Sequence, residues 1–500
     1  MKTTLFCTLA CIFLFSCSSP DSTNETLSII TGQVSDFSKV SEHDEVNIKF
    51  RDPVAGDVEF STTLDSTGKF RMELDVEFPR EFRLNYSGYL QYYIYPGDSL
   101  HFEIDGLCWS KVSESRAEEY AYYTVSGTSE AMNRNVALFT ALYQDSLANW
   151  AVRDSVVRAS EPLDFRAFVD SRTSDRQLYV EKFSLAQGAS DDFRNWARRK
   201  ITLAGWGDLI MYCWMKPPRE SDERIAFIQA LPDEYFSFLD EWDREDRGYL
   251  GNSDFEFFLQ QYQMILDQLV PLDTQQYYRD IWQEDFARAA AYTPRYYSEA
   301  ENGYARDLII ASYYYRLLDA KYYEKIKDIV DTSLIVDDQA RAKVTKKYRY
   351  EKDLFENMEF AEGSKFKEIA GVETFFDTMV SMYPDKVIYV DFWATWCSPC
   401  MNEMPHAKKI KKQLADKDVI FVYLGNRCEE GAWKATIAER EMEGEHYLLT
   451  DEQFAHLTTE FDFRGIPRYI LVDRQGQVVN QNAPRPSSGQ ELVELISQHL

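Results

Sequence analysis

Between residues 27 and 108, apolar and polar side chains alternate in short runs that are rich in β-branched and aromatic residues. This two-residue period is typical of half-buried strands. The predicted strands are 29–34, 46–50, 58–62, 70–74, 89–95 and 100–104. Gly and Pro at 65–69 and 96–99 supply the backbone angles of tight turns. We therefore predict a small β-domain over residues 27–108.

From residue 109 to 360, apolar residues instead recur three and four positions apart, as at 136–147 and 308–323. This spacing predicts amphipathic helices. Proline-containing breaks are expected to separate them at Pro217, Pro218, Pro232, Pro271 and Pro294. Tyrosine runs at 313–315 and 322–323 could bind a ligand, but tyrosines at helix-packing boundaries explain them more simply. No fixed repeat of solenoid length is evident, so residues 109–360 are predicted as an all-helical domain.

Residues 361–500 change character again. Nearly continuous apolar runs at 387–392, 419–424 and 469–472 predict buried strands, and a turn at 473–476 leads into 478–479. Helices are expected after Cys397, at 432–442 and at 490–499. Strand–helix alternation with continuous apolar strands indicates a central, partly parallel sheet with helices on both faces. The chain is thus predicted to be multidomain, with α+β and α/β parts.

The net charge of the chain argues against one class of function, nucleic-acid binding. The 500-residue chain has a formal net charge of −28 and no strongly basic stretch. Proteins that bind nucleic acids need a basic face, because phosphate contacts dominate their affinity. We therefore expect no nucleic-acid partner.

The first residues are typical of a targeting segment. Lys2 precedes an apolar run at 5–15, which is too short to span a bilayer as a mature helix. The run ends in Leu14-Phe15-Ser16-Cys17, which resembles the lipobox of bacterial lipoproteins. The alternative is an ordinary cleaved signal with a chance cysteine. The resemblance implies a signal peptide over 1–17, lipidation at Cys17, and a polar tether over 18–26. It also implies a periplasm-facing position in the envelope of a Gram-negative-type bacterium, on a membrane that the sequence does not identify.

Five of the eight cysteines follow Cys17, namely Cys108, Cys213, Cys397, Cys400 and Cys428. So few cysteines in a long chain do not form a disulfide framework, and their odd number leaves at least one unpaired within the chain. A bridge between Cys108 and Cys213 is conceivable but not favoured. Cys428 is either part of a redox relay or, more simply, a half-buried inert thiol.

Cys397 and Cys400 stand three positions apart at a predicted strand-to-helix junction. This spacing lets them close a small disulfide loop. The free N–H groups at a helix start favour the thiolate of the first cysteine, so Cys397 is predicted as nucleophile and Cys400 as resolving thiol. Pro399 suits the first helical turn. Zinc binding would need a second ligand pair, which the scattered histidines do not provide, so neither a metal nor a cofactor is expected.

The surrounding residues carry a family resemblance. Residues 390–400, Val-Asp-Phe-Trp-Ala-Thr-Trp-Cys-Ser-Pro-Cys, resemble the thioredoxin signature. The following Glu403-Met404-Pro405 is similar to the TlpA/ResA branch of membrane-tethered thiol–disulfide oxidoreductases. Gly465-Ile466-Pro467 matches the cis-proline loop of that family, and the resemblance covers roughly the last 140 residues. The β-domain, through residues 32–34 and 95–100, resembles the domain of uncharacterised function that often precedes such domains.

The resemblance implies roles for several residues. Asp391 would be a buried proton acceptor for Cys400, although many tethered relatives have Asn at this position. Pro467 would be cis and lie against Cys397, with the backbone of Ile466 pairing with substrate.

Three further residues would flank the site. Trp396 would form the rim. Glu403 would either tune the site electrostatically or be an ordinary carboxylate of the first helical turn. Arg468 replaces the Thr that relatives usually have, which alters the expected substrate contact.

The implied function is that of a lipid-anchored reductase in the cell envelope. It would take electrons from a membrane thiol carrier and reduce disulfides of envelope proteins. A disulfide isomerase or oxidase would use the same dithiol. A third alternative is a binding lipoprotein that the dithiol merely regulates. A peroxidase is less favoured, because peroxiredoxin-type sites centre on a single cysteine.

Overall fold

The structure is a computed structural model that describes residues 27–36, 45–86, 89–106, 123–143, 149–217, 221–269 and 285–500. The predicted signal peptide 1–17, its Cys17, the tether 18–26 and Cys108 lie outside the described residues. The chain divides into two compact units. One comprises residues 1–50, 59–144 and 180–195, and the other comprises 51–58, 145–179 and 196–500. None of the described helices is both long and apolar enough to cross a bilayer.

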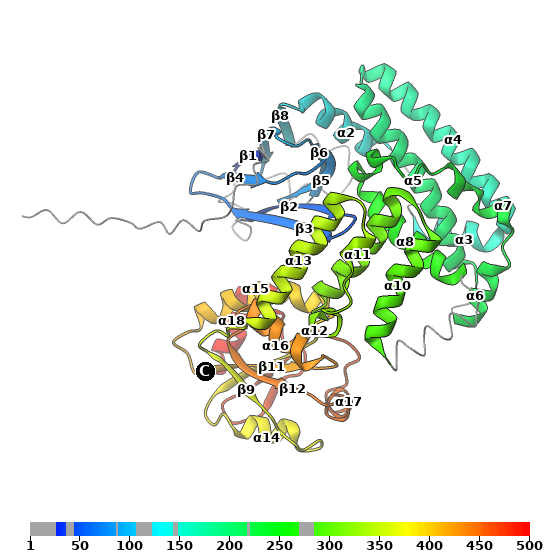
Figure 1. The fold of residues 1–500 in the computed structure, drawn as a ribbon. Helices are drawn as coiled ribbons and strands as arrows, with labels where there is room; N and C mark the ends of the chain where they lie inside the picture. Colours follow the sequence, from blue (N-terminus) through cyan, green and yellow to red (C-terminus); the bar gives the residue numbers. More distant parts are fainter. Residues whose placement is uncertain are drawn as a thin grey trace, which may run out of the picture. The chain divides into compact units, whose positions relative to one another are not determined.

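Two four-stranded sheets account for the β-rich part of the chain (Figure 1). The first has the order β4-β1-β7-β8, with strands Lys69–Leu74, Ser28–Ser35, Ser99–Asp105 and Tyr123–Gly127. The second has the order β3-β2-β5-β6, with strands Gly56–Thr63, Glu45–Asp52, Arg80–Asn85 and Tyr89–Ile94. In β1 and β4, every second side chain is buried, as the alternating sequence predicts. Helix α2, Glu130–Leu142, follows β8.

Strand β8 lies beyond residue 108, where the alternating pattern ends. Its residues pair antiparallel with β7, from Leu100 opposite Gly127 to Ile104 opposite Tyr123. Strand β8 has only five residues, too few to show a clear two-residue period beside the charged residues that precede it. The sheet therefore extends past the end of the β-domain that the sequence indicates.

The middle of the chain is helical, as predicted. Among its described residues, the α-helices are α3 Trp150–Ala159, α4 Pro162–Gln187, α5 Asp191–Met215, α6 Ser221–Gln229, α7 Asp233–Phe236, α8 Ser253–Leu269, α10 Phe286–Ala300, α11 Gly303–Asp319, α12 Tyr323–Ile326 and α13 Asp338–Glu356. Tyr313 and Tyr314 are buried in α11, which supports the packing interpretation of the tyrosine runs. The predicted break at Pro294 is wrong, because this proline lies inside α10. Burial of Ala289, Ala290 and Tyr297 on the same helix favours its continuation despite the missing N–H.

Charged side chains link α11 and α13 to the C-terminal part of the same unit. Lys321, two residues after the end of α11, donates to Glu351 of α13 at 2.7 Å and to Glu439 of α16 (Glu430–Glu439) at 2.8 Å. Lys347 lies 3.0 Å from the same Glu351 carboxylate. Both Lys321 and Glu351 are buried, so this cluster is an internal part of the unit rather than a surface ion pair.

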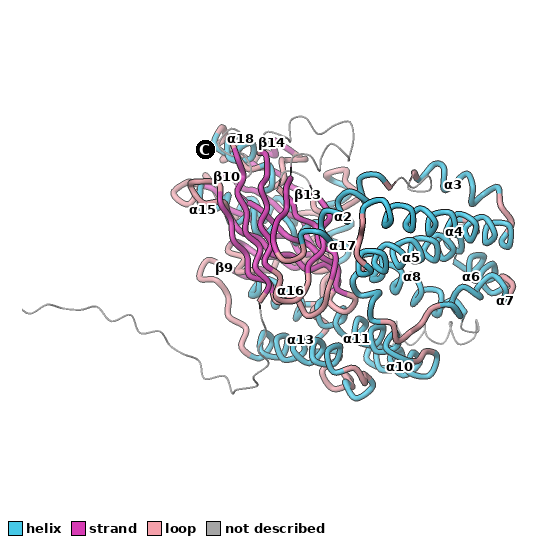
Figure 2. Tube along the Cα trace, turned by 90° about the horizontal axis from the view of Figure 1, so that it is seen from above, coloured by secondary structure: helices cyan, strands magenta, loops and turns pink. Residues whose placement is uncertain are grey.

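Residues 364–497 form one six-stranded sheet with helices on both faces. The strand order is β14-β13-β10-β11-β12-β9, with strands Val478–Asn480, Arg468–Val472, Val387–Trp393, Val419–Gly425, Gly444–Leu448 and Ser364–Lys367. Strands β9 to β12 pair parallel, whereas β13 pairs antiparallel with β10, and β14 pairs antiparallel with β13. Figure 2 shows the strands of this sheet side by side. The helices are α14 Phe375–Ser381, α15 Ser398–Gln413, α16 Glu430–Glu439, α17 Asp451–Glu460 and α18 Gln490–Ser497.

Each face of this sheet has its own apolar core. Residues of α15, α16 and α18 pack on one face, and residues of α14 and α17 pack on the other. All seven side chains of β10 are buried, as expected for a central strand covered on both faces. This arrangement confirms the predicted partly parallel sheet and the multidomain α+β and α/β class.

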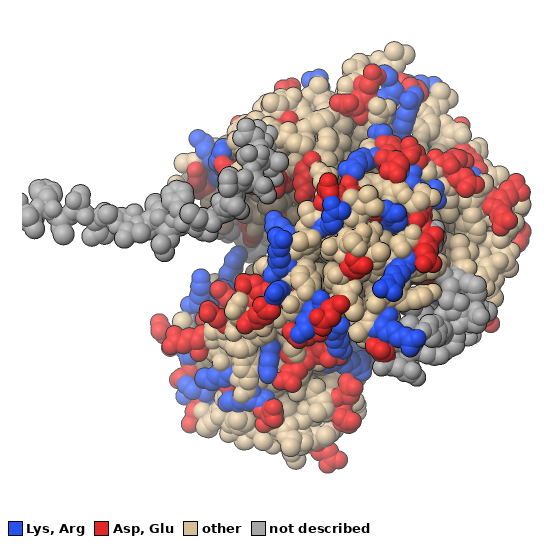
Figure 3. Space-filling model, in the orientation of Figure 1, with Lys and Arg blue, Asp and Glu red and all other residues tan. Residues whose placement is uncertain are grey.

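Acidic and basic side chains are interspersed on the face of the molecule drawn in Figure 3. No broad basic area is visible on that face, in keeping with the net charge of −28.

Candidate active site

The two predicted cysteines meet where β10 gives way to α15. Cys397 and Cys400 form a disulfide with a Cα–Cα distance of 5.2 Å. Cys397 is the N-cap of α15, and its sulfur accepts a hydrogen bond from the Cys400 N–H at 3.2 Å. Pro399 lies in the first turn, where its missing N–H costs nothing. The start of α15 thus directs the Cys400 N–H toward the sulfur of Cys397, and this contact together with the helix dipole favours a thiolate there once the disulfide is reduced.

The rim of the site is held by the loop after β11. The indole N–H of Trp396 donates to the Arg427 carbonyl at 3.1 Å, while the ring stays 58% exposed. The side chain of Asn426 donates to the Trp393 carbonyl at 2.8 Å. The loop leading to Cys397 is therefore fixed on one side, and Trp396 remains available for contact with another molecule.

The loop before β13 carries the predicted proline. The Ile466–Pro467 peptide bond is cis, and the Ile466 side chain packs against the same apolar cluster as Cys397 and Cys400. Arg468 donates to the side chain of Asn482 at 2.8 Å, and its guanidinium lies 5.6 Å from the Phe463 ring centroid. The side chain of Arg468 is thus tied to its own domain.

Cys428 belongs to the same neighbourhood, which its position in the sequence does not reveal. Its sulfur accepts a hydrogen bond from the Thr395 N–H at 3.3 Å and donates to the Asn426 carbonyl at 3.1 Å. Burial raises the pKa of this thiol. Of the two interpretations of Cys428, the geometry favours a protonated thiol that supports the loop.

Asp391 lies in the middle of the apolar strand β10 and is 3% exposed. Its Oδ1 atom has no hydrogen-bond partner. Burial raises the pKa of this carboxyl well above its usual range, and the charge of Glu403 raises it further, while Lys411 opposes the shift. Asp391 is therefore suited to carry and exchange a proton near neutral pH.

Glu403 is a buried residue of α15, three positions after Cys400. One of its oxygens accepts the Ser487 N–H at 2.8 Å, and the other accepts the Ser487 hydroxyl at 2.9 Å. Helix α15 begins at Ser398 and has no acidic residue in its first turn, so the first-turn interpretation of Glu403 is wrong. Its partners instead come from a 3-10 turn, Pro486–Ser488, more than 80 residues away.

Lys411 is a member of the site that the sequence analysis missed. Its ammonium lies 4.7 Å from the Tyr423 ring centroid and donates to the Glu443 carbonyl. Burial lowers the pKa of Lys411 to about 8, against the opposing effects of Glu443 and Asp391. The available signal was its spacing of eight residues from Glu403, which places both on one face of α15.

The described residues contain no group of three His, Cys, Asp or Glu side chains placed to hold a metal ion. What they contain is a disulfide, a buried proton-binding carboxyl, a second carboxylate held by Ser487, and a half-buried lysine. This set is suited to two-electron exchange between thiols and disulfides, coupled to proton transfer.

Comparisons with known proteins agree with this chemistry. The Redoxin family model matches residues 362–494. Thioredoxin-like protein YneN of Bacillus subtilis (strain 168) is 53% identical over 93 residues, covering 19% of this chain and 54% of the relative. Thiol-disulfide oxidoreductase ResA of Bacillus anthracis is 25% identical over 96 residues, covering 19% of this chain and 54% of that relative. The chain thus spans about half the length of these relatives.

Among solved structures, the thioredoxin domain of a thiol-disulfide oxidoreductase from Bacteroides vulgatus is 26% identical, with a TM-score of 0.21. The match covers 24% of this chain and 81% of that one. The resemblance to ResA-type proteins that residues 390–405 indicate is confirmed by the sequence relatives.

Proposed function

We propose that the protein is a thiol–disulfide oxidoreductase that acts through Cys397 and Cys400, since residues 362–494 match the Redoxin family model and a ResA protein is similar to this region. One observation carries the proposal. The two cysteines form a disulfide at the start of α15, in the same apolar core as β10, whose buried Asp391 has a raised pKa. A reactive dithiol needs both a stabilised thiolate and a group that accepts the proton of the second thiol.

In the reducing direction, the cycle starts from the dithiol form. The Cys397 thiolate attacks one sulfur of a substrate disulfide, forming a mixed disulfide and releasing the other substrate sulfur as a thiolate. Cys400 then loses its proton to Asp391, and its thiolate attacks the Cys397 sulfur. The second substrate thiolate leaves, and the Cys397–Cys400 disulfide forms. The two released thiolates take up two protons, and the substrate has gained two electrons.

Asp391, Glu403 and Lys411 would together control the transfer of the Cys400 proton. Asp391 is poised to accept it because burial and the nearby charge of Glu403 disfavour its ionised form. Lys411 lowers the pKa of Asp391, since its positive charge favours the ionised carboxylate. Ser487 holds the Glu403 carboxylate in place through two hydrogen bonds, so its effect on the pKa of Asp391 comes from a fixed position.

We further propose that the protein works as a reductase in the cell envelope, lipid-anchored through Cys17. Its substrates would be disulfide-bearing envelope proteins, and a membrane thiol carrier would reduce Cys397–Cys400 again. The lipobox-like residues 14–17 and the resemblance to the TlpA/ResA branch support this part. Operation as an oxidase or isomerase would use the same residues, and the reduction potential distinguishes the directions.

The central test is trapping on the full chain. A Cys400→Ser variant cannot resolve the mixed disulfide, so we expect it to retain a model disulfide peptide covalently on Cys397. Cys397→Ser should retain none, and Cys428→Ser is the matched control that should turn over like the wild type. If the Cys400→Ser variant traps no peptide while the wild type reduces it, the assigned roles are wrong.

Two further measurements test the direction of electron transfer and the attachment to a membrane. A reduction potential close to that of strongly oxidising periplasmic enzymes, about −120 mV, would contradict the reductase assignment. Cys17→Ala should move the protein from the membrane fraction to the soluble envelope fraction. Unchanged membrane association of that variant would contradict the lipid anchor.

A further inference from the structure

The loop of residues 426–429, between β11 and α16, connects the rim of the redox site to the helical region within the larger unit. Its first three residues each make a hydrogen bond to the segment 393–396, which leads to Cys397. Its fourth residue, Glu429, instead accepts a hydrogen bond from the ammonium group of Lys325 in α12, at 2.7 Å. The loop is therefore held from two sides, by the redox site and by the helical region.

The backbone of this loop depends on those contacts. Arg427 has a φ angle of 48°, in the left-handed region that a residue with a Cβ atom rarely adopts. Such a conformation persists only where the surrounding contacts outweigh its cost. Loss of the attachment on either side should therefore let the loop relax, and the Arg427 carbonyl, which accepts the indole N–H of Trp396, would move with it.

The helical region provides a firm support for Lys325. The neighbouring residues of α12, Tyr323 and Ile326, are 3% and 0% exposed. The ammonium group of Lys325 also lies 5.4 Å from the Phe286 ring centroid. The pair with Glu429 is itself at the surface, where an ion pair adds little stability. Its main effect is therefore on the position of the loop rather than on the stability of the fold.

Helix α16, which follows the loop, is attached to the same region at both ends (Figure 1). At its last residue, Glu439 accepts hydrogen bonds from Lys321 at 2.8 Å and from the Tyr350 hydroxyl at 2.9 Å. At its first turn, a Cβ atom added to Gly431 would lie 3.6 Å from the Phe355 ring. The helical region thus fixes the helix that follows the loop as well as Glu429 itself.

We propose that Lys325 is a positioning residue for the redox site. By holding Glu429, it keeps the loop of residues 426–429, and through that loop Trp396, in the arrangement that receives a substrate disulfide. This inference rests on the thiol–disulfide function proposed above. It gives the helical region a part in substrate recognition.

The contacts also say which step Lys325 affects. The hydrogen bonds of the loop end on the segment 393–396, whereas the Cys397 sulfur is bound by the Cys400 N–H within α15. Lys325 should therefore influence the binding of a substrate more than the reactivity of the thiolate.

A charge swap on the full chain tests the proposal. Lys325→Glu and Glu429→Lys each place two like charges opposite each other, and the double variant restores an ion pair. Single-turnover oxidation of the reduced protein by a model disulfide peptide, over a range of peptide concentrations, separates peptide affinity from maximal rate. Each single variant should raise the half-saturating concentration about fivefold and keep the maximal rate within about twofold, as expected for one surface ion pair. The double variant should behave like the wild type.

Lys327→Glu is the matched control, because Lys327 pairs with Glu324 of its own segment. It should leave the half-saturating concentration unchanged. An unchanged half-saturating concentration in Lys325→Glu would refute the proposal. So would a defect that persists in the double variant, or one confined to the maximal rate.

Labelling of Cys428 by iodoacetamide in the oxidised chain tests the position of the loop without using the activity. Peptide mapping should find labelling about fivefold faster in each single variant, and unchanged in the double variant and in Lys327→Glu. Cys213, which is 0% exposed, should stay unlabelled wherever the fold is intact. If the reduced wild type does not react with the peptide, the proposed function fails. Equal Cys428 labelling in Lys325→Glu and the wild type would instead refute the role of Lys325.

Discussion

Replacing Asp391 by asparagine should stabilise the C-terminal domain at neutral and alkaline pH. The folded protein raises the pKa of this carboxyl through burial and the charge of Glu403, whereas an unfolded chain leaves it near 3.9. The folded state thus binds the proton more tightly than the unfolded state does. Its stabilising contribution is complete below about pH 4 and is lost as pH rises from the unfolded pKa toward the folded one. Asp391→Asn removes this loss, so its advantage over the wild type should grow with pH.

The structure sets the size of the effect. Asp391 is 3% exposed, and Oδ1 has no hydrogen-bond partner. An unsatisfied buried polar group costs about 1–3 kcal/mol, and a charged one costs more. The amide introduced by the substitution keeps an unpaired oxygen but carries no charge. We therefore expect a gain of about 2 kcal/mol at pH 8, equivalent to about 30-fold slower amide exchange under conditions where reclosing is faster than chemical exchange.

Hydrogen–deuterium exchange of the β10 and β11 amides in the oxidised full chain measures this difference. It reports the stability of one domain without requiring two-state unfolding of the whole chain. Asp416→Asn, at an exposed position of the same domain, is the control and should behave like the wild type. If Asp391→Asn is no more protected at pH 8 than the wild type, or if its advantage is the same at pH 5, then Asp391 does not lie in a charge-disfavouring environment.

Three further predictions concern other residues. In the reduced protein, iodoacetamide should modify Cys428 at least about tenfold more slowly than Cys397, as burial raises the pKa of Cys428; equal rates in peptide mapping would contradict this. Burial lowers the pKa of His446 to about 4, so the stability it contributes is present above pH 6.5 and falls by about 3 kcal/mol as pH drops to 4. His446→Phe should reduce the pH dependence of the stability measured by hydrogen exchange between pH 4 and 6.5. An unchanged pH dependence in this variant would contradict the lowered pKa of His446. Lys321→Met should destabilise by about 1–3 kcal/mol in thermal unfolding, because it leaves the buried Glu351 with fewer partners, whereas the double variant with Glu351→Leu should recover part of the loss.

Strong local patterns made much of the C-terminal fold predictable. Continuous apolar strands located the sheet, and the placement of Asp391 inside one of them predicted its burial. The spacing of Cys397 and Cys400 predicted the disulfide loop, because both sulfurs belong to one helical turn. In these cases the information lies within about ten consecutive residues.

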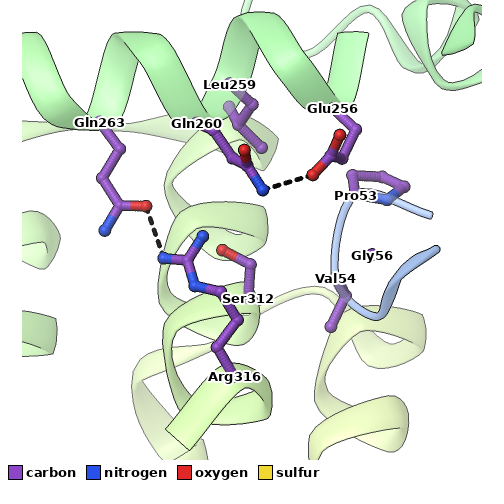
Figure 4. Close-up of a pocket in the computed structure, with 9 residues that line it drawn as sticks. All are labelled: Pro53, Val54, Gly56, Glu256, Leu259, Gln260, Gln263, Ser312 and Arg316. Carbon is purple, nitrogen blue, oxygen red and sulfur yellow. Dashed lines mark hydrogen bonds between the residues drawn. The ribbon is translucent and has the colours of Figure 1, made fainter. Parts of the chain in front are cut away.

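The parts that escaped prediction depend on residues that meet only after folding. Ser487 reaches Glu403 from 84 positions away, and Cys428 reaches Thr395 from 33 positions away. The small pocket between α8, α11 and the turn at 53–56 likewise combines three distant segments (Figure 4). Pro294 is the opposite case: proline usually ends a helix, but here the packing of α10 keeps the helix continuous through it.

Strand β9 has a practical consequence for cutting the chain. Ser364–Lys367 is an outer strand of the six-stranded sheet, and among the strands that the structure describes it pairs only with β12. Lys365 and Lys367 also bind Glu445 of β12, at 3.1 and 2.9 Å. A fragment that starts after Lys367 would expose the backbone groups of β12 and leave Glu445 without its lysines, which invites strand-to-strand aggregation. A soluble C-terminal fragment should therefore begin before Ser364, so that it includes β9, the strand that completes its sheet.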